Sequence, residues 1–191
     1  MAFRNYPVLH PWHSLDVGDN PPELLNAVIE VPANSKVKYE LDKRSGLIMV
    51  DRILYGPFRY PTNYGFIPQS YCDDGDPLDI LVYCQEPLVP RCLAPARVIG
   101  AMGMIDQGEG DDKIIAVLDS DPAFKGVDDV SQMPAYLLEE LKEFFTVYKQ
   151  LEKKEVEVKE IVGRQEALKL VTESLELYKK HAEELRAKDI G

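Results

Sequence analysis

The sequence LDILVYC at residues 78–84 is apolar, rich in branched side chains and of strand length. Two similar runs follow it, ARVIGAMGMI at residues 96–105 and IIAVL at 114–118, and three precede it, at 24–31, 36–41 and 47–54. Turn-forming residues separate these runs. Short strands at this spacing predict a mainly β protein, built as either a barrel or a sandwich.

After residue 134 the pattern changes to helical spacing. Apolar residues between Leu137 and Leu151 recur at steps of three and four, which predicts an amphipathic helix with Ser131 as its cap and Pro134 in its first turn. A short strand is predicted at residues 155–158. A second apolar stripe, from Leu168 to Leu185, predicts another helix that packs on the core or on a partner helix.

The length of 191 residues suits one domain with a sizeable core, so we expect a single domain over residues 1–191. Residues 1–23 contain several prolines and the cluster His10-Pro11-Trp12-His13. This segment predicts an irregular arm laid on the surface, in which the cluster has a packing role rather than a chemical one.

The chain carries 33 acidic and 22 basic side chains, a formal charge of −11, which disfavours binding to nucleic acid or to anionic membranes. No stretch reaches 18 consecutive apolar residues, and the first residues lack the apolar core of a secretory signal. We therefore expect a cytoplasmic protein, or an organellar one if a transit segment has been removed. Cys72, Cys84 and Cys92 have neither disulfide-framework nor zinc-site spacing, so free thiols are expected.

Two acidic turns stand out. Asp74-Gly75-Asp76-Pro77-Leu78-Asp79 places three carboxylates together with no basic residue between them. Either a raised pKa or a divalent cation relieves the repulsion within such a group, although a solvated acidic turn is the alternative. The second turn, from Asp106 to Lys113, lies between two β runs, and Asp106 and Asp111 are expected to point inward from a hairpin loop. Neither turn has the spacing of a calcium-binding helix–loop–helix site.

Further charged and aromatic residues lie upstream of these turns. Lys38 and Glu40 share one face of a predicted strand because side chains repeat every two residues. Without partners such a pair is a solvated face. Tyr60 and Tyr64 are expected on either side of a turn, where packing as aromatic core residues with polar tips is the alternative role.

Between Glu30 and Glu152 the chain resembles the family I soluble inorganic pyrophosphatases. Residues 74–79 match the D-G-D-P-x-D signature of that family residue for residue. Other motifs agree in order and spacing: KYE at 38–40, VDR at 50–52, YPxNYG at 60–65, Asp106 with Asp111 and Lys113, and FFxxYK at 144–149.

The resemblance implies a mainly β fold with α, a closed five-stranded barrel of the OB type with two flanking C-terminal helices. It also implies an enzyme that hydrolyses inorganic diphosphate to two orthophosphates, using water activated by Mg²⁺. The metal ligands would be Asp74, Asp79, Asp106 and Asp111, and the general base Asp76. The phosphates would be held by Lys38, Arg52, Tyr64, Tyr148 and Lys149. Indirect contacts to metal or phosphate would come from Glu30, Glu40, Tyr60 and Lys113.

Acidic side chains outnumber basic ones by three in this implied site. Diphosphate adds about three to four negative charges, which about three or four Mg²⁺ ions would offset. A non-catalytic barrel module that binds divalent cations or oligoanions is the alternative. A nucleotide pyrophosphohydrolase would need a base-recognition pocket, which the sequence does not display. By resemblance the chain is expected to form a homo-oligomer, a trimer or a hexamer.

Overall fold

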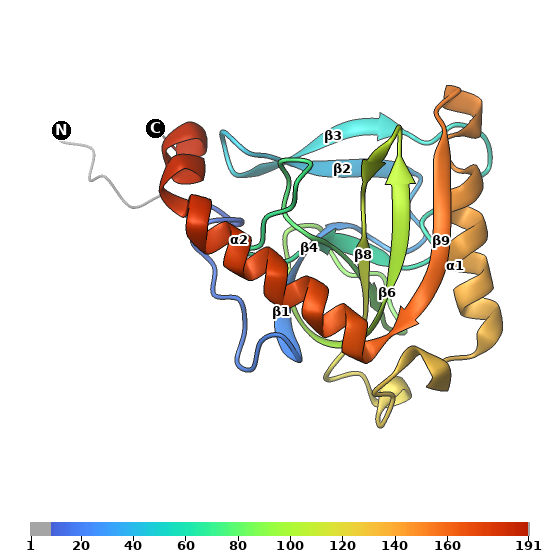
Figure 1. Cartoon of the computed structure of the whole chain (residues 1–191). Helices are drawn as coiled ribbons and strands as arrows, with labels where there is room; N and C mark the ends of the chain where they lie inside the picture. The colour runs from blue at the N-terminus through green and yellow to red at the C-terminus, as the bar shows by residue number, and fades with distance from the viewer. Residues whose placement is uncertain (1–8, 191) are drawn as a thin grey trace.

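The computed structural model describes residues 9–190 (Figure 1). Its strands are β1 (Leu24–Val31), β2 (Val37–Asp42), β3 (Leu47–Ile53), β4 (Asn63–Phe66), β5 (Asp79–Tyr83), β6 (Leu93–Asp106), β7 (Glu109–Gly110), β8 (Lys113–Leu118) and β9 (Val156–Gly163). Its helices are α1 (Ala135–Val147) and α2 (Arg164–Ile190). Short 3₁₀ helices lie at Pro122–Phe124, Val130–Gln132 and Gln150–Glu152.

Five strands pair in a closed ring. The order is β1-β4-β5-β8-β6, and β6 pairs back with β1. All neighbours are antiparallel except β5 and β8, which are parallel. This ring confirms the prediction of a closed five-stranded barrel with two flanking helices. The strands β7 and β9 pair with β6 outside the ring, and β2 and β3 form a separate hairpin.

The strands of the ring are buried on both faces. Leu81 of β5 belongs to the same apolar cluster as Phe145 of α1, whereas its neighbour Ile80 belongs to the cluster of Val171 of α2. Successive side chains of a strand point to opposite faces, so each helix covers side chains of one face only. Figure 1 shows α1 beside β9 and α2 crossing the sheet on another side.

The parallel pairing of β5 and β8 positions the acidic residues. Asp79, the first residue of β5, lies opposite Lys113, the first residue of β8. Asp106 is the last residue of β6, and the hairpin loop that follows carries Asp111. Carboxylates from two distant acidic turns therefore meet at one end of the ring.

The strand at residues 63–66 was not among the predicted strands. Tyr60 and Tyr64 lie on either side of a bend at residues 61–62, as expected. Residues 63–66 form the ring strand β4, because pairing with both β1 and β5 satisfies its backbone hydrogen bonds. A Cβ atom on Gly65 would lie 1.9 Å from the carbonyl oxygen of Val28, so only glycine permits this close approach to β1.

Two smaller expectations also need correction. Ser131 does not cap α1: its backbone N–H donates to the side chain of Asp129, and Pro134 precedes α1 without a side-chain cap. The strand predicted at residues 155–158 runs from Val156 to Gly163, because β6 is long enough to pair with all of it.

Residues 1–8 of the predicted arm lie outside the described residues. The rest of the arm is irregular up to β1 and buries Trp12 in a cluster with Val28, Phe66 and Tyr178. Trp12 Nε1 donates to the carbonyl oxygen of Ser70 at 2.7 Å. The three cysteines are free thiols, as expected. Among the described residues, no helix combines the length and the apolarity needed to cross a membrane.

Candidate active site

A pocket of about 590 Å³ opens at the end of the ring where the two acidic turns meet. Thirteen of the fourteen predicted site residues line it: Glu30, Lys38, Glu40, Tyr60, Tyr64, Asp74, Asp76, Asp79, Asp106, Asp111, Lys113, Tyr148 and Lys149. Arg52 is not among the lining residues. The pocket therefore gathers side chains from β1, β2, β4, β5, β6 and β8, from the loops between them and from the end of α1.

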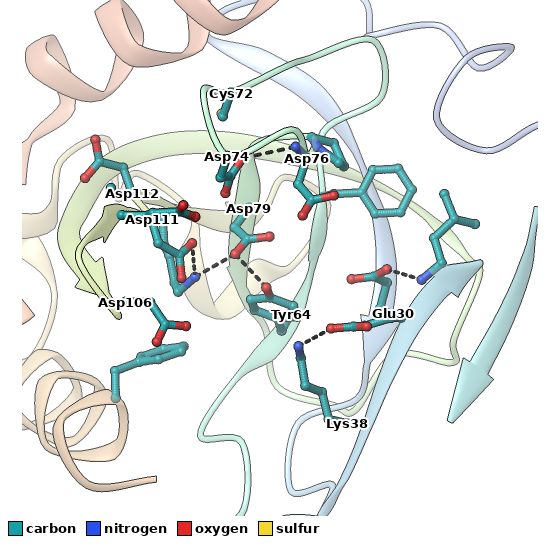
Figure 2. Close-up of a pocket in the computed structure, with 18 of the residues that line it drawn as sticks. Glu30, Lys38, Tyr64, Cys72, Asp74, Asp76, Asp79, Asp106, Asp111 and Asp112 are labelled. Carbon is teal, nitrogen blue, oxygen red and sulfur yellow. Dashed lines mark hydrogen bonds and ion pairs between the residues drawn. The ribbon is translucent and has the colours of Figure 1, made fainter. Parts of the chain in front are cut away.

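Lys113 joins two of the carboxylates. Its ammonium group donates to Asp79 at 2.6 Å and to Asp111 at 2.8 Å, while the Tyr64 hydroxyl also donates to Asp79 at 2.6 Å (Figure 2). Burial disfavours the charged form of Lys113, but the carboxylates of Asp79 and Asp111 outweigh this and raise its pKa. Burial raises the pKa of Asp111, with the charge of Asp79 adding to the effect. Lys113 thus stays charged and holds both carboxylates in place.

The turn at residues 74–76 presents two further carboxylates. Gly75 has a φ of +88°, which glycine adopts readily, and the backbone N–H of Asp76 donates to Asp74 Oδ1 at 3.0 Å. Burial, followed by the charges of Asp76 and Asp79, raises the pKa of Asp74 to about 6 even though this hydrogen bond opposes the shift. A carboxylate with a raised pKa in a cleft is suited to a cation, which would stabilise its charged form.

Asp106 lies on the side of the pocket nearest α1. Its Oδ2 atom pairs with Lys149, and its Oδ1 atom is buried without a hydrogen-bond partner among the described residues. Burial lowers the pKa of Lys149 although Asp106 opposes the shift. An orphaned carboxylate oxygen in a polar pocket is an available ligand atom for a metal ion or for water.

The wall formed by β1 and β2 is also charged. Lys38 and Glu40 form an ion pair on one face of β2, as the sequence predicts. Glu30 is buried behind them and accepts a hydrogen bond from the backbone N–H of Leu41 at 2.6 Å. Burial, together with the charge of Asp79, raises the pKa of Glu30 to about 8.

Arg52 lies next to the pocket rather than in its lining. Its Nε donates to Glu152 at 3.0 Å and its Nη1 to Asp51 at 2.5 Å, whereas its Nη2 is buried without a partner among the described residues. Tyr148 is buried at the end of α1, where burial raises its pKa and the charge of Asp106 adds to the shift. Its phenol therefore remains protonated and able to donate.

A family model described as inorganic pyrophosphatase matches residues 27–179. The chain belongs to the inorganic pyrophosphatase family. Soluble inorganic pyrophosphatase 2 of Chlamydomonas reinhardtii is 53% identical over 181 residues, which cover 95% of this chain and 94% of that protein. Soluble inorganic pyrophosphatase 1 of Arabidopsis thaliana is 50% identical over 169 residues, covering 88% of this chain and 80% of that protein. The crystal structure of the inorganic pyrophosphatase from Thermus thermophilus has a TM-score of 0.85 and 40% identity, covering 88% of this chain and 99% of that one.

These comparisons confirm the predicted family, the enzyme class and the reaction, hydrolysis of inorganic diphosphate. They also support a divalent metal as the cofactor of this pyrophosphatase family member. Among residues 9–190, no group of three or more His, Cys, Asp or Glu side chains is arranged to hold a metal ion. Lys113 and Lys149 pair with the acidic side chains instead.

The donor set nevertheless fits Mg²⁺. This ion needs only one or two carboxylates, because water and phosphate oxygens complete its octahedron. The free Oδ1 of Asp106 and the raised pKa of Asp74 both mark oxygen atoms that a cation would stabilise. A pyrophosphatase pocket of this composition therefore suits a hard divalent cation.

Three charged residues of the pocket lining are not among the predicted site residues. Lys43, which follows β2, lines the pocket and pairs with Asp76. Glu109 and Asp112 of the second acidic turn also line the pocket, and Glu109 is exposed there. No local pattern singles out Lys43, since a lysine in a charged turn is usually solvated.

Proposed function

We propose that this inorganic pyrophosphatase hydrolyses diphosphate in the pocket lined by Asp74, Asp76, Asp79, Asp106 and Asp111, with Mg²⁺ as the metal. The observation that carries this proposal is the meeting of these carboxylates with the ammonium groups of Lys38, Lys113 and Lys149 in one pocket. Only such a mixture can hold both a divalent cation and a polyanion.

Asp74, Asp79, Asp106 and Asp111 would hold Mg²⁺. When bound, the metal supplies positive charge that offsets the charge of diphosphate and lowers the pKa of a coordinated water. The charge balance of the site favours about three or four ions per site with substrate. Lys113 would keep Asp79 and Asp111 aligned, since it donates to both of them.

Asp76 would act as the general base. The oxygen of the attacking water forms a bond to one phosphorus, Asp76 accepts a proton from that water, and the bond from the phosphorus to the bridging oxygen breaks. The bridging oxygen keeps the electron pair and leaves with the second phosphate. No covalent enzyme intermediate is required in this scheme.

Lys38, Arg52, Tyr64, Tyr148 and Lys149 would hold the phosphates. The unpartnered Nη2 of Arg52, which lies next to the pocket, supports this role because its hydrogen-bonding capacity is unused. The metal and the phosphates would be contacted indirectly, through water or through Lys38 and Tyr64, by Glu30, Glu40 and Tyr60. The pairing of Lys38 with Glu40 and the tilted packing of the Tyr60 ring against Tyr64 support this assignment.

A homo-oligomer, trimeric or hexameric, and a cytoplasmic location are part of the same proposal. The hairpin strand β3 supports an assembly, because Leu47, Met49, Val50 and Ile53 are large apolar side chains exposed on it. Light scattering coupled to size-exclusion chromatography measures the subunit number directly.

The test of the proposed function is phosphate release from diphosphate by the purified protein, with and without Mg²⁺ and with ATP as a competing substrate. We expect rapid Mg²⁺-dependent release from diphosphate and little release from ATP. A folded, metal-loaded protein that binds diphosphate without releasing phosphate would instead be a non-catalytic cation- or oligoanion-binding barrel.

A further inference from the structure

Lys43 connects the Asp74–Asp76 turn to the N-terminal arm. It lies in the turn between β2 and β3, and its side chain reaches into the pocket. Its ammonium group pairs with the carboxylate of Asp76 and donates to the carbonyl oxygen of Gly75 at 3.2 Å. One cation therefore contacts both the backbone and the side chain of the turn that carries the proposed base.

Within residues 9–190, the Asp76 carboxylate forms no ion pair other than the one with Lys43. The backbone of the turn is held by hydrogen bonds, from the N–H of Cys72 to the carbonyl of Asp76 and from the N–H of Gly75 to the carbonyl of Cys72. Neither bond constrains the Asp76 side chain, which is 52% exposed. The rotamer of Asp76 thus depends on Lys43.

Contacts with the N-terminal arm fix the position of Lys43. Its carbonyl oxygen accepts a hydrogen bond from His10 Nε2 at 2.6 Å, and its ammonium group lies 5.6 Å from the centre of the Trp12 ring. The same turn packs on the arm at Gly46, where a Cβ atom would lie 3.2 Å from Pro11 Cδ. Trp12 is 1% exposed, so the surface against which Lys43 rests is rigid.

Helix α2 in turn fixes the position of the N-terminal arm. His13 stacks between His10 and Trp12, with ring centroids 4.6 and 4.5 Å away. Its Nδ1 accepts from the Tyr178 hydroxyl at 2.8 Å and its Nε2 donates to Asp189 at 3.1 Å, both on α2. The arm therefore has a fixed position relative to the ring, and its contacts with Lys43 fix the position of Lys43 as well.

We propose that Lys43 is a positioning residue for the hydrolysis: through its ion pair it orients the Asp76 carboxylate toward the attacking water. The inference rests on the proposed role of Asp76 as base. Stability is not its main effect, since the Lys43 side chain is 37% exposed and exposed ion pairs contribute little to stability. Its effect is on geometry, where a displacement of about 1 Å can lower a rate about 100-fold.

The competing role for a lysine in this pocket is direct binding of phosphate. The two roles differ in kinetics: loss of a phosphate contact raises KM, whereas loss of orientation of the base lowers kcat at nearly constant KM. For Lys43→Met we expect kcat to fall about 10- to 100-fold with KM within about twofold. Lys43→Arg should recover most of kcat, because the guanidinium also reaches a carboxylate.

Arg44→Met is the matched control. Arg44 is the exposed neighbour of Lys43, lies outside the pocket lining and carries the same charge. It should keep kcat and KM near the original values. Thermal melting of all variants checks that each is folded. A rise in KM without a fall in kcat for Lys43→Met, or an equal loss for Arg44→Met, would overturn the inference.

A double-mutant cycle separates this inference from the proposed function. In the Asp76→Asn background, Lys43→Met should cost little further turnover, because the group it orients no longer accepts a proton. Full additivity of the two losses would overturn the positioning role while leaving the base assignment intact. Unchanged turnover in Asp76→Asn alone would overturn the base assignment and the inference with it.

Discussion

The Lys113 ammonium lies 2.6 Å from the Asp79 carboxylate although only 2% of the Lys113 side chain is exposed. These two residues begin the parallel strands β5 and β8 and are direct register partners. A buried charge is tolerated when it is paired and hydrogen-bonded, and Asp111 completes the pairing. The acidic pocket is thus built on a buried cation, and removal of either partner leaves an uncompensated charge.

Lys113→Met should destabilise the metal-free protein by about 3–5 kcal/mol, because it leaves Asp79 and Asp111 facing each other without a counter-charge. Mg²⁺ should restore part of this loss, so the rise in Tm on adding Mg²⁺ should be larger for the variant than for the original protein. Scanning calorimetry with EDTA and with Mg²⁺ measures both effects. Lys179→Met, an exposed change on α2, is the control, and an equal Mg²⁺ response in both variants would contradict the prediction.

Asp76→Asn should lower kcat by about 10²- to 10⁴-fold, the usual contribution of a general base. The amide keeps the shape of the side chain, and Asp76 is not one of the proposed metal ligands. Metal affinity, measured by calorimetric titration with Mg²⁺, should therefore stay within a small factor of the original. A large loss of metal affinity would show that Asp76 is a ligand rather than a base.

Glu30→Gln should make the metal-free protein more stable at high pH. Burial raises the pKa of Glu30 from 4.5 to about 8, so the folded state holds a proton that the unfolded state has released between these values. Stability is therefore lost as the pH rises from about 4.5 through about 8. The neutral amide removes this loss, worth about 2–4 kcal/mol at pH 8.5.

Urea unfolding in EDTA at pH 5 and pH 8.5 measures the effect of this change. The glutamine can still accept the hydrogen bond from the Leu41 N–H, so the two proteins should differ little at pH 5. Parallel stability curves at the two pH values would show that Glu30 is charged in the folded protein.

His13→Gln should make stability less sensitive to acid. Burial lowers the pKa of His13 below 6.5, and the hydrogen bond to Asp189 only partly opposes the shift. The unfolded state therefore binds a proton more readily, and the folded protein loses stability as the pH falls below 6.5. The slope of the unfolding free energy against pH, measured between pH 5 and 6.5, should be shallower in the variant. An unchanged slope would mean that His13 is not buried as a neutral ring.

Gly65→Ala should cost about 3 kcal/mol or more, because its Cβ would meet the Val28 carbonyl oxygen at 1.9 Å and the backbone of β1 or β4 must shift. Gly110→Ala is the matched control, since nothing lies within 4 Å of its Cβ position. Guanidinium unfolding midpoints compare the two. Similar midpoints would contradict the close packing of β4 on β1.

Local patterns predicted the strands well where the sequence has an apolar run of strand length. The run at residues 24–31 is β1 without any change of bounds, and 78–84 contains β5. They failed at β4, which is only four residues long and in which Asn63 and Gly65 have low strand propensity. That strand exists because β1 and β5 pair with it on both sides, and partners far away in the chain are invisible to a local window.

The sequence by itself determined the strand-rich class, the two helices and the acidic turns, because side-chain periodicity and the spacing of carboxylates are local properties. Only the tertiary structure decided that β6 closes the ring on β1, that Lys113 stands between Asp79 and Asp111, and that Lys43 reaches Asp76. Apart from the contact between Lys113 and Asp111, these contacts join residues that are distant in the chain. Their geometry follows from the packing of the whole core, which fixes strand register and brings both acidic turns to the same end of the ring.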